Sequence, residues 1–421
     1  MHREYAASLL RTAATPVEWQ LYASQLEQPI DLSFQVLSGS FRDYRFENCD
    51  FTSAILTGAD FDGAQFKNCT FDSADLRDTS FVDTTFETCT LNDAMAARAT
   101  FRRSAFTASS VSLAKTHQLR LVDVTFDHCP VVVIDGTDLE LSTIRIARSP
   151  TVGLRVGGTL RELTVLDSSL QSLELLPETV FERSRADDST LELLTGHLAT
   201  IQHVTLRNCE LLSSSLDDCV VAGLDLSGSR IIDTDTTTLG LSTARLRDSF
   251  FDGCRWSRQK GRVTVFGRYV ADPDLMREPV QDVRGIPIVR RREIADAQYI
   301  DALWRNYPNP VRRSMLRFWG GTCSYGQSPA RLALFATVLV MIHTVALLAA
   351  RGQLVGTHPD PELFASGFVD ALGFFFGGSP PDQQNRGALE LVALDARMAG
   401  LLVLGIWVTV AARQVMRLAT D

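Results

Sequence analysis

The stretch FENCDFTSAILTGADFDGAQFKNCTFDSADL, residues 46–76, places Phe or Leu at every fifth position. Helices place apolar residues about every 3.6 positions and flat strands at every second position, so a period of five fits neither. The backbone must therefore turn a corner once in every five residues. Four corners close one coil of about twenty residues, and successive coils are expected to stack at the spacing of neighbouring strands, about 4.8 Å.

Two positions of each five-residue unit, or pentad, are predicted to point into the coil. One holds a large apolar residue that fills the centre, and the position two residues before it is mostly small. The other three positions are mostly polar and are predicted to face outward. The predicted core includes the large residues Phe46, Phe51, Phe61, Phe66, Phe71, Leu76 and Phe81 and the small residues Cys49, Cys69 and Cys89.

The segments SAIL, GADF, GAQF, NCTF and SADL in this stretch resemble the repeats of the pentapeptide-repeat family. The consensus of that family is a small residue, Asp or Asn, then Leu or Phe, then two polar or small residues. The resemblance implies an all-β fold, a right-handed quadrilateral β-helix, in which the coils form a solenoid.

The same frame can be followed without an insertion to Trp256, which gives about 43 pentads in nearly eleven coils. At the strand spacing the rod would be about 50 Å long. In the middle third the small position is often enlarged, as in LEL at residues 139–141, so we expect wider or distorted coils there. The frame assigns Val131, Leu166 and Leu176 to the core, with departures at Thr116, Gly136, Thr151, Arg161, Gln171, Gly196 and Thr236.

The chain is predicted to have four parts. Residues 1–35 form an N-terminal leader or cap, residues 36–256 the solenoid, residues 257–330 a basic neck with one helix, and residues 331–421 a membrane domain. Residues 5–26 have helical spacing and would cover the open end of the first coil; a loosely attached leader is the alternative. The N-terminus lacks an apolar run long enough for a signal peptide, so the solenoid is expected in the cytoplasm.

Seven of the eight cysteines stand at the small inward position: Cys49, Cys69, Cys89, Cys129, Cys209, Cys219 and Cys254. No CxxC spacing is present to bring thiolates together on a metal. A reducing compartment and parallel Cβ directions disfavour disulfides between stacked coils. We therefore interpret these cysteines as small buried residues. No catalytic triad order, P-loop or dinucleotide fingerprint occurs, so neither an enzyme nor a cofactor is predicted.

Two segments are apolar enough to be predicted as transmembrane helices, residues 332–350 and 392–413. Arginines precede the first and follow the second, whereas the segment between them is acidic, so both termini are expected on the cytoplasmic side of a bacterial inner membrane. Before the first span, Arg312, Arg313 and Arg317 lie in a basic, aromatic stretch. They would contact anionic lipid, or they are merely the charge that orients the span.

Residues 364–380 are too short to cross and are predicted to form a re-entrant segment, with Phe374, Phe375, Phe376, Gly377 and Gly378 as its pore-facing part. The chain has, in order, a neck helix, YGQSP just before a span, an aromatic half-helix, a glycine turn and a second span. This order resembles bacterial pentapeptide-repeat proteins with a two-transmembrane domain similar to potassium-channel pore modules. A TVGYG-type filter is absent, so ion selectivity is not implied.

Three functions follow from these features. The first is a membrane-anchored cytoplasmic scaffold that binds an unidentified protein partner, and the second is a homo-oligomeric pore assembled or gated by the solenoid. The third is an acidic mimic of DNA, as in pentapeptide-repeat proteins that protect gyrase. Residues 31–256 carry 33 acidic and 20 basic residues, which is a weak excess for a nucleic-acid mimic, and a nucleic-acid partner is not favoured. The lipid bilayer is the remaining predicted partner.

Overall fold

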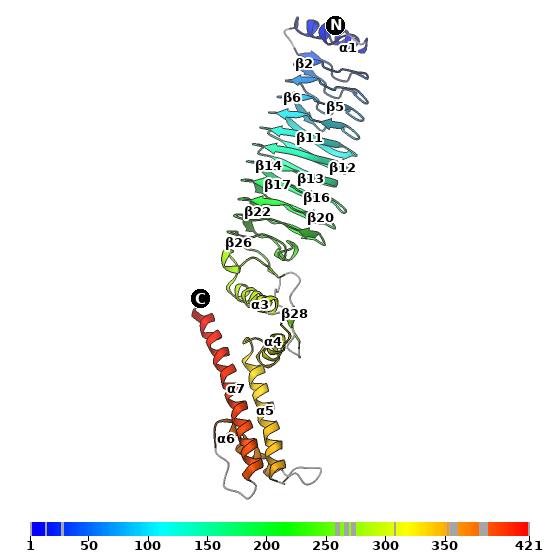
Figure 1. Ribbon diagram of the computed structural model, residues 1–421. Coiled ribbons are helices and arrows are strands. Elements are labelled where there is room, and N and C mark those ends of the chain that lie inside the picture. Colours follow the sequence, from blue (N-terminus) through cyan, green and yellow to red (C-terminus); the bar gives the residue numbers. More distant parts are fainter. Residues whose placement is uncertain are drawn as a thin grey trace. The chain divides into compact units, whose positions relative to one another are not determined.

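The computed structural model describes residues 2–12, 15–26, 29–256, 262–264, 269–270, 275–306, 309–351, 353, 361–378 and 386–419 (Figure 1). The chain forms two compact units. The first comprises Met1–Gln259 and Asp274–Ile294, and the second comprises Lys260–Pro273 and Ala295–Asp421.

The first unit is a β-solenoid of about 11 turns, with parallel strands on successive coils. Its regular coils keep a register of twenty residues, so that Phe46 pairs with Phe66, Phe66 with Phe86 and Phe86 with Phe106. The first strands are β1 (Ile30–Asp31), β2 (Arg45–Glu47), β3 (Cys49–Asp50), β4 (Gln65–Lys67), β5 (Ser80–Val82), β6 (Thr85–Glu87), β7 (Thr90–Asn92), β8 (Thr100–Arg102) and β9 (Ala105–Thr107).

The corners between these strands are made by outward polar residues. Asn48, Asn68 and Asp83 have φ angles of 52°, 51° and 56°, in the left-handed region that Asn and Asp tolerate better than most residues. These residues therefore contribute to the fold directly, because each one turns the chain into the next strand.

The middle coils have longer strands, and their register shifts at several points. Their strands are β10 (Ser110–His117), β11 (Arg120–Asp127), β12 (Val132–Ala147), β13 (Val152–Arg161), β14 (Thr164–Leu166) and β15 (Ser169–Leu175). Register shifts occur between Leu113 and Thr116 and between Gly136 and Leu139.

The continuous frame predicted for these coils is wrong in detail. Val131, Leu166 and Leu176 are only half-buried, whereas their neighbours Val132, Val165 and Leu175 are buried. From residue 160 to residue 175 the inward residues come one position early, and the frame is restored at residue 181.

Glycine makes the slip that begins at residue 160 sterically feasible. At Gly158, which has a φ of 120°, a Cβ would lie 2.4 Å from the carbonyl oxygen of Leu139. Only glycine can bring the chain this close to the preceding coil, and Leu160 rather than Arg161 then points inward. The shift of one position is reversed at the corner that contains Pro177 and Glu178, so the original frame resumes at residue 181.

The later coils return to short strands and the original frame. Their strands are β16 (Val180–Glu182), β17 (Arg185–Asp187), β18 (Thr190–Leu191), β19 (Leu194–His197), β20 (Thr200–Gln202), β21 (Thr205–Arg207), β22 (Glu210–Leu212), β23 (Ser215–Asp217), β24 (Val220–Ala222), β25 (Arg230–Ile232) and β26 (Phe250–Asp252).

Two helices cover the start of the solenoid, α1 (His2–Arg11) and α2 (Pro16–Ala23). Thr15 and Glu18 form a capping box at the start of α2. Trp19 is fully buried; its ring centroid lies 5.3 Å from that of Phe46, and its Nε1 donates to the carbonyl oxygen of Arg45 at 2.9 Å. The segment is therefore packed as a cap on the first coils.

The last coil is covered by a segment that the five-residue period did not predict. Arg284 pairs with Phe250 as a further parallel neighbour, and the N–H of Phe251 donates to the carbonyl oxygen of Arg284 at 3.0 Å. Met276 and Val283 nearby are fully buried. Residues 275–286 thus continue the solenoid beyond Trp256 and close its core.

The second unit contains the antiparallel pair β27 (Arg262–Val263) and β28 (Tyr269–Val270) and a set of helices. The helices are α4 (Pro310–Cys323), α5 (Pro329–Ala350), α6 (Pro361–Phe375) and α7 (Arg386–Ala419), preceded by α3 (Ile288–Asn306), whose residues fall in both units. The predicted neck therefore holds two helices, α3 and α4, rather than one.

Candidate functional site

The structure places the predicted core residues inside the coils. The rings of Phe46, Phe66 and Phe86 form one stack with centroids 5.1 and 5.0 Å apart. The other predicted core residues, Phe51, Phe61, Phe71, Leu76, Phe81, Cys49, Cys69 and Cys89, are also buried. These residues make the framework of the solenoid and are not accessible to a ligand.

The inward cysteines contribute weak hydrogen bonds to the preceding coil. The Sγ of Cys69 donates to the carbonyl oxygen of Phe46 at 3.2 Å, and the Sγ of Cys89 donates to that of Phe66 at 3.5 Å. Ser104, at an equivalent position, donates to the carbonyl oxygen of Phe81 at 2.6 Å. A thiol or hydroxyl at the small position thus links two coils, a role that the residue spacing alone did not reveal.

Burial disfavours the thiolate form of several of these cysteines. Burial raises the pKa of Cys69 and of Cys129, and it raises the pKa of Cys209 to about 11. Nucleophilic attack and metal binding both require the thiolate, which burial disfavours here. All eight cysteines are free, and among the described residues no group of His, Cys, Asp or Glu is arranged to hold a metal ion.

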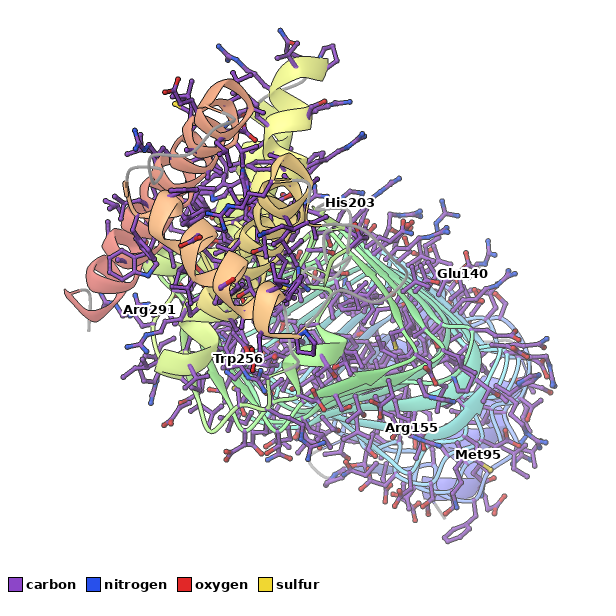
Figure 2. All side chains as sticks on the ribbon, turned by 90° about the horizontal axis from the view of Figure 1, so that it is seen from below. Met95, Glu140, Arg155, His203, Trp256 and Arg291 are labelled. Carbon is purple, nitrogen blue, oxygen red and sulfur yellow. The ribbon has the colours of Figure 1, made fainter. Side chains whose placement is uncertain are left out.

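Charged side chains on the outside pair between successive coils. Arg98 and Asp78 approach to 2.6 Å, as do Arg103 and Asp83, and each pair joins residues twenty apart. Further pairs of this kind are Lys67–Glu87, Arg120–Glu140, Arg155–Asp135, Arg230–Glu210 and Arg255–Asp235. Glu140 and Arg155 are labelled on the surface in Figure 2. Many acidic groups are thus neutralised within the solenoid.

One column of the surface in the N-terminal coils holds three exposed apolar residues, with Asp75 between the second and the third. Val36 is the parallel neighbour of Ile55, Ile55 of Asp75, and Asp75 of Met95. Val36, Ile55 and Met95 are exposed, and Met95 projects from the surface in Figure 2. Asp75 is held by two hydrogen bonds from Arg77, at 2.8 and 2.6 Å. We call Val36, Ile55 and Met95 the apolar column.

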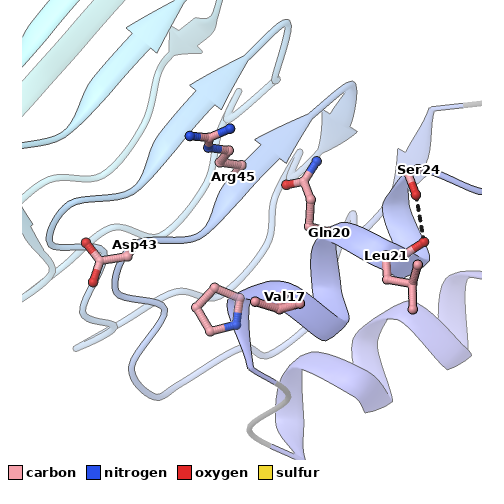
Figure 3. A pocket seen from close by; sticks show the side chains of 7 residues that line it. Val17, Gln20, Leu21, Ser24, Asp43 and Arg45 are labelled. Atoms are coloured by element: carbon pink, nitrogen blue, oxygen red, sulfur yellow. Dashed lines mark hydrogen bonds between the residues drawn. The ribbon is translucent and has the colours of Figure 1, made fainter.

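An open hollow of about 460 Å³ lies beside the N-terminal cap (Figure 3). Val17 and Leu21 of α2 line one side, and Asp43 and Arg45 of the first coils line the other. The Oε1 of Gln20 is buried there without a hydrogen-bond partner among the described residues. The lining of the hollow is mostly apolar, and the hollow lies where helix α2 packs against the first coils.

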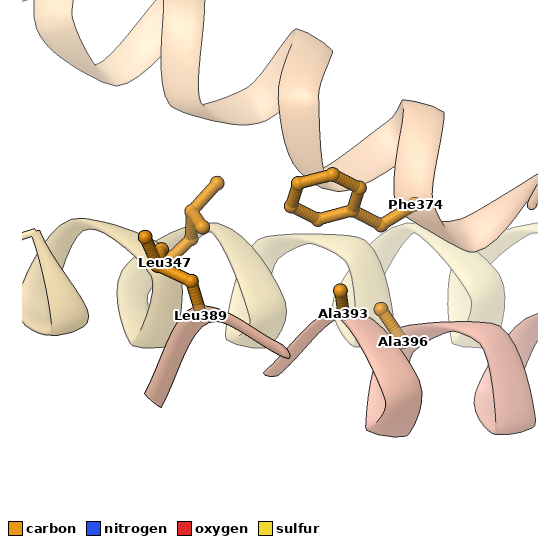
Figure 4. Close-up of a cluster of buried hydrophobic side chains, with 5 residues drawn as sticks. All are labelled: Leu347, Phe374, Leu389, Ala393 and Ala396. Carbon is orange, nitrogen blue, oxygen red and sulfur yellow. The ribbon is translucent and has the colours of Figure 1, made fainter. Parts of the chain in front are cut away.

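Two helices of the described chain are long and apolar enough to cross a membrane, within Pro329–Ala350 and Gly387–Ala412. They correspond to the predicted spans. The shorter α6 packs against both, and Phe374 of α6 lies in a cluster with Leu347 of α5 and Leu389, Ala393 and Ala396 of α7 (Figure 4).

Two contacts between polar side chains join α5 to α6 and to α7. Arg351 follows α5 and pairs with Asp370 of α6 at 2.6 Å. The Nε2 of His343 lies 3.2 Å from a carboxylate oxygen of Asp395, and its Nδ1 lies 2.7 Å from the carbonyl oxygen of Leu339.

The predicted pore-facing residues lie at the end of α6. The N–H of Gly378 donates to the carbonyl oxygen of Gly373, and that of Gly377 donates to the carbonyl oxygen of Phe374. With Gly377 at a φ of 96°, these bonds form the glycine cap that commonly ends a helix. Arg397 donates to the carbonyl oxygen of Gly378 at 3.2 and 2.6 Å. The glycine pair thus ends α6 and anchors it to α7.

A hollow of about 620 Å³ lies beside this cap. Among the described residues that line it, Arg397 is the one that carries a charge. Its apolar walls include Phe375, Phe376, Leu401, Leu404 and Trp407. Gly400 allows the close contact of the helices, because a Cβ there would lie 2.0 Å from the carbonyl oxygen of Phe375. The sequence indicated neither the hollow nor the paired polar groups around it.

The predicted lipid-contact residues Arg312, Arg313 and Arg317 are all exposed on α4. Exposed apolar residues of the same helix are Val311, Met315 and Phe318. The combination is typical of a helix that lies at a membrane surface.

The regular coils match a known family of sequences. Residues 40–115 match the family model described as a pentapeptide repeat region. None of the curated proteins matches the chain.

Two solved structures are similar at low identity. HetL, a pentapeptide repeat protein involved in heterocyst differentiation regulation from the cyanobacterium Nostoc sp., is 15% identical over 60% of this chain and 98% of its own, with a TM-score of 0.24. QnrB1, a plasmid-mediated fluoroquinolone resistance protein, is 16% identical over 53% and 91%, with a TM-score of 0.19. The family match and the parallel coils together identify residues 40–115 as a pentapeptide repeat region within a β-solenoid.

Proposed function

We propose that this chain is a membrane-anchored scaffold whose solenoid binds a protein partner in the cytoplasm. The observation that carries the proposal is the apolar column, Val36, Ile55 and Met95, on a surface where many charges pair among themselves. Exposed apolar groups that lie together mark protein-binding surfaces more often than groups scattered singly. Because parallel bridges join the stacked coils at these positions, the column is held in place before a partner arrives, which lowers the entropy cost of binding.

The helical unit supplies the anchor in this proposal. Helices α5 and α7 cross a bacterial inner membrane, with both termini of the chain on the cytoplasmic side. The exposed Arg312, Arg313 and Arg317 of α4 then contact anionic headgroups at that surface. Resistance of the full-length protein to carbonate extraction tests the anchor, and release into the soluble fraction would refute it.

The scaffold role is tested by changing the column without changing the coils. Ile55→Asp and Met95→Asp place charges on exposed positions, so the fold is expected to persist while partner binding is lost. Leu198→Asp, at another exposed apolar position of the solenoid, is the matched control. The readout is in-cell cross-linking of the full-length protein. The scaffold role is wrong if no cross-linked protein depends on Ile55 or Met95.

A pore is the second candidate function, and the length of α6 favours it. Its 15 residues span about 22 Å, less than a hydrocarbon core of about 30 Å, so it forms a half-helix between the two spans. Against conduction, the carbonyl of Gly378 is bonded to Arg397. Liposomes containing the full-length protein would show ion flux if it is a pore, and deletion of residues 364–382 would remove that flux. The DNA-mimic role has the least support, because many acidic groups are paired with arginines.

A further inference from the structure

Asp395 carries an exposed carboxylate within the apolar helix α7. Its side chain is 83% exposed, and it contacts His343, which stands seven residues before the end of α5 at Ala350. At 1.5 Å per residue, this distance along the helix is about 10 Å. If α5 crosses a bilayer, as the proposed function holds, the carboxylate of Asp395 lies inside the hydrocarbon layer.

Such a group requires protein or water beside it. Ionisable side chains in membrane spans almost always face a helix bundle or an aqueous cavity, because lipid tails offer them no hydrogen bonds. His343 contacts Asp395 from one side only, since the carboxylate stays largely exposed. A further protein surface or an aqueous cavity must therefore lie beside it.

The two sides of α7 differ in shape and charge. Arg397 stands two residues after Asp395, so the two side chains point about 200° apart around the helix. On the Asp395 side, Leu391, Met398 and Leu402 are exposed and form an apolar ridge. On the Arg397 side lies the hollow of about 620 Å³.

We propose that a second copy of this chain covers Asp395, so that Asp395 of one copy faces Arg397 of the next and the apolar ridge enters the hollow. The charges are opposite, and the ridge and the hollow match in polarity. A guanidinium has five N–H donors, so the two bonds to Gly378 leave Arg397 able to bind a carboxylate.

This contact uses different surfaces on the two copies, so it repeats from copy to copy. A repeated contact of this kind closes into a ring or continues as a filament. In a bilayer the copies share one plane and orientation, and a ring is the expected product. The inference rests on the proposed membrane anchor. It goes beyond that anchor by proposing which surface α7 contacts in the membrane.

Two charge reversals test the contact when the variants are mixed. Asp395→Arg gives copies with Arg at both positions, and Arg397→Asp gives copies with Asp at both, so each variant alone repels itself. When co-expressed under two tags, each variant offers the charge that the other lacks. Full-length protein in lipid nanodiscs is measured by native mass spectrometry, with far-UV circular dichroism as the check on folding.

We expect oligomers for the wild type, a shift to the single-chain mass of 46.4 kDa for each variant alone, and oligomers containing both tags for the mixture. Asp395→Asn, which keeps the size of the side chain, should weaken assembly without repulsion. Glu390→Arg, an exposed reversal in α7 outside the proposed pair, should leave the mass unchanged.

Oligomers that persist in both reversed variants, or a mixture that stays monomeric, would overturn the pairing. A wild-type chain that is monomeric yet resistant to carbonate extraction would overturn it while leaving the membrane anchor in place. Release of the wild type by carbonate would instead show that the anchor has failed, and the pairing with it.

Discussion

Replacement of Phe66 by alanine should be among the most destabilising single truncations in the solenoid. Its ring stacks on Phe46 and Phe86 at 5.1 and 5.0 Å, and the rings of Phe61 and Phe71 meet it at 68° and 83°. Removal of a buried Phe side chain typically costs about 3–5 kcal/mol. The stacked neighbours are fixed by pairing between coils, so the cavity cannot easily collapse, and we expect the upper half of this range.

The assay is thermal unfolding of the full-length protein in detergent, followed by the strand signal in circular dichroism. For a unit of this size a loss of 1 kcal/mol lowers Tm by roughly 2–4 °C, so Phe66→Ala should lower it by roughly 8–20 °C. Met95→Ala is the matched control, because Met95 is exposed and its loss should change stability by less than about 0.5 kcal/mol. Equal effects of the two substitutions would refute the role of the ring stack.

Three further predictions concern other parts of the chain. Cys69→Ala should cost less than about 1.5 kcal/mol in thermal unfolding and leave partner binding intact, and loss of binding would contradict its purely structural role. The hydrogen bond from Arg77 lowers the pKa of Asp75 in the folded protein. Asp75 therefore stabilises the fold above its unfolded pKa of about 3.9, and this stabilisation is lost as the pH falls through the lower folded pKa. The difference in Tm between the wild type and Asp75→Asn should persist at pH 7 and vanish in strong acid. Gly400→Ala should separate α6 from α7 and cost about 1–3 kcal/mol, whereas Gly405→Ala, where a Cβ meets nothing within 4 Å, should be neutral in the same measurement.

The regular coils were predictable from the sequence because only one register buries every aromatic ring. The middle coils were not, because apolar residues there occur as adjacent pairs. In the pairs Val131–Val132, Val165–Leu166 and Leu175–Leu176 either residue satisfies the period, and the structure buries Val132, Val165 and Leu175. Which residue of each pair is buried depends on the lengths of the nearby corners, and the five-residue period does not predict those lengths.

The closing segment and the helical contacts needed three-dimensional information. Met276 and Val283 close the last coil without repeating the five-residue pattern, so the pattern could not predict that they are buried. His343 and Asp395 are 52 residues apart, and nothing in the sequence pairs the one with the other. Their pairing depends on how α5 and α7 align.

The twenty-residue register also determines which changes in length the solenoid can accept. Deletion of a whole coil shortens the stack, yet every later side chain keeps its direction. Insertion of a single pentad preserves the inward and outward pattern but turns everything after it by a quarter of a revolution. The solenoid can therefore change in length by twenty residues while a binding surface stays aligned along the stack. A change of five residues, the smallest that preserves the core, turns the later part of that surface to another side.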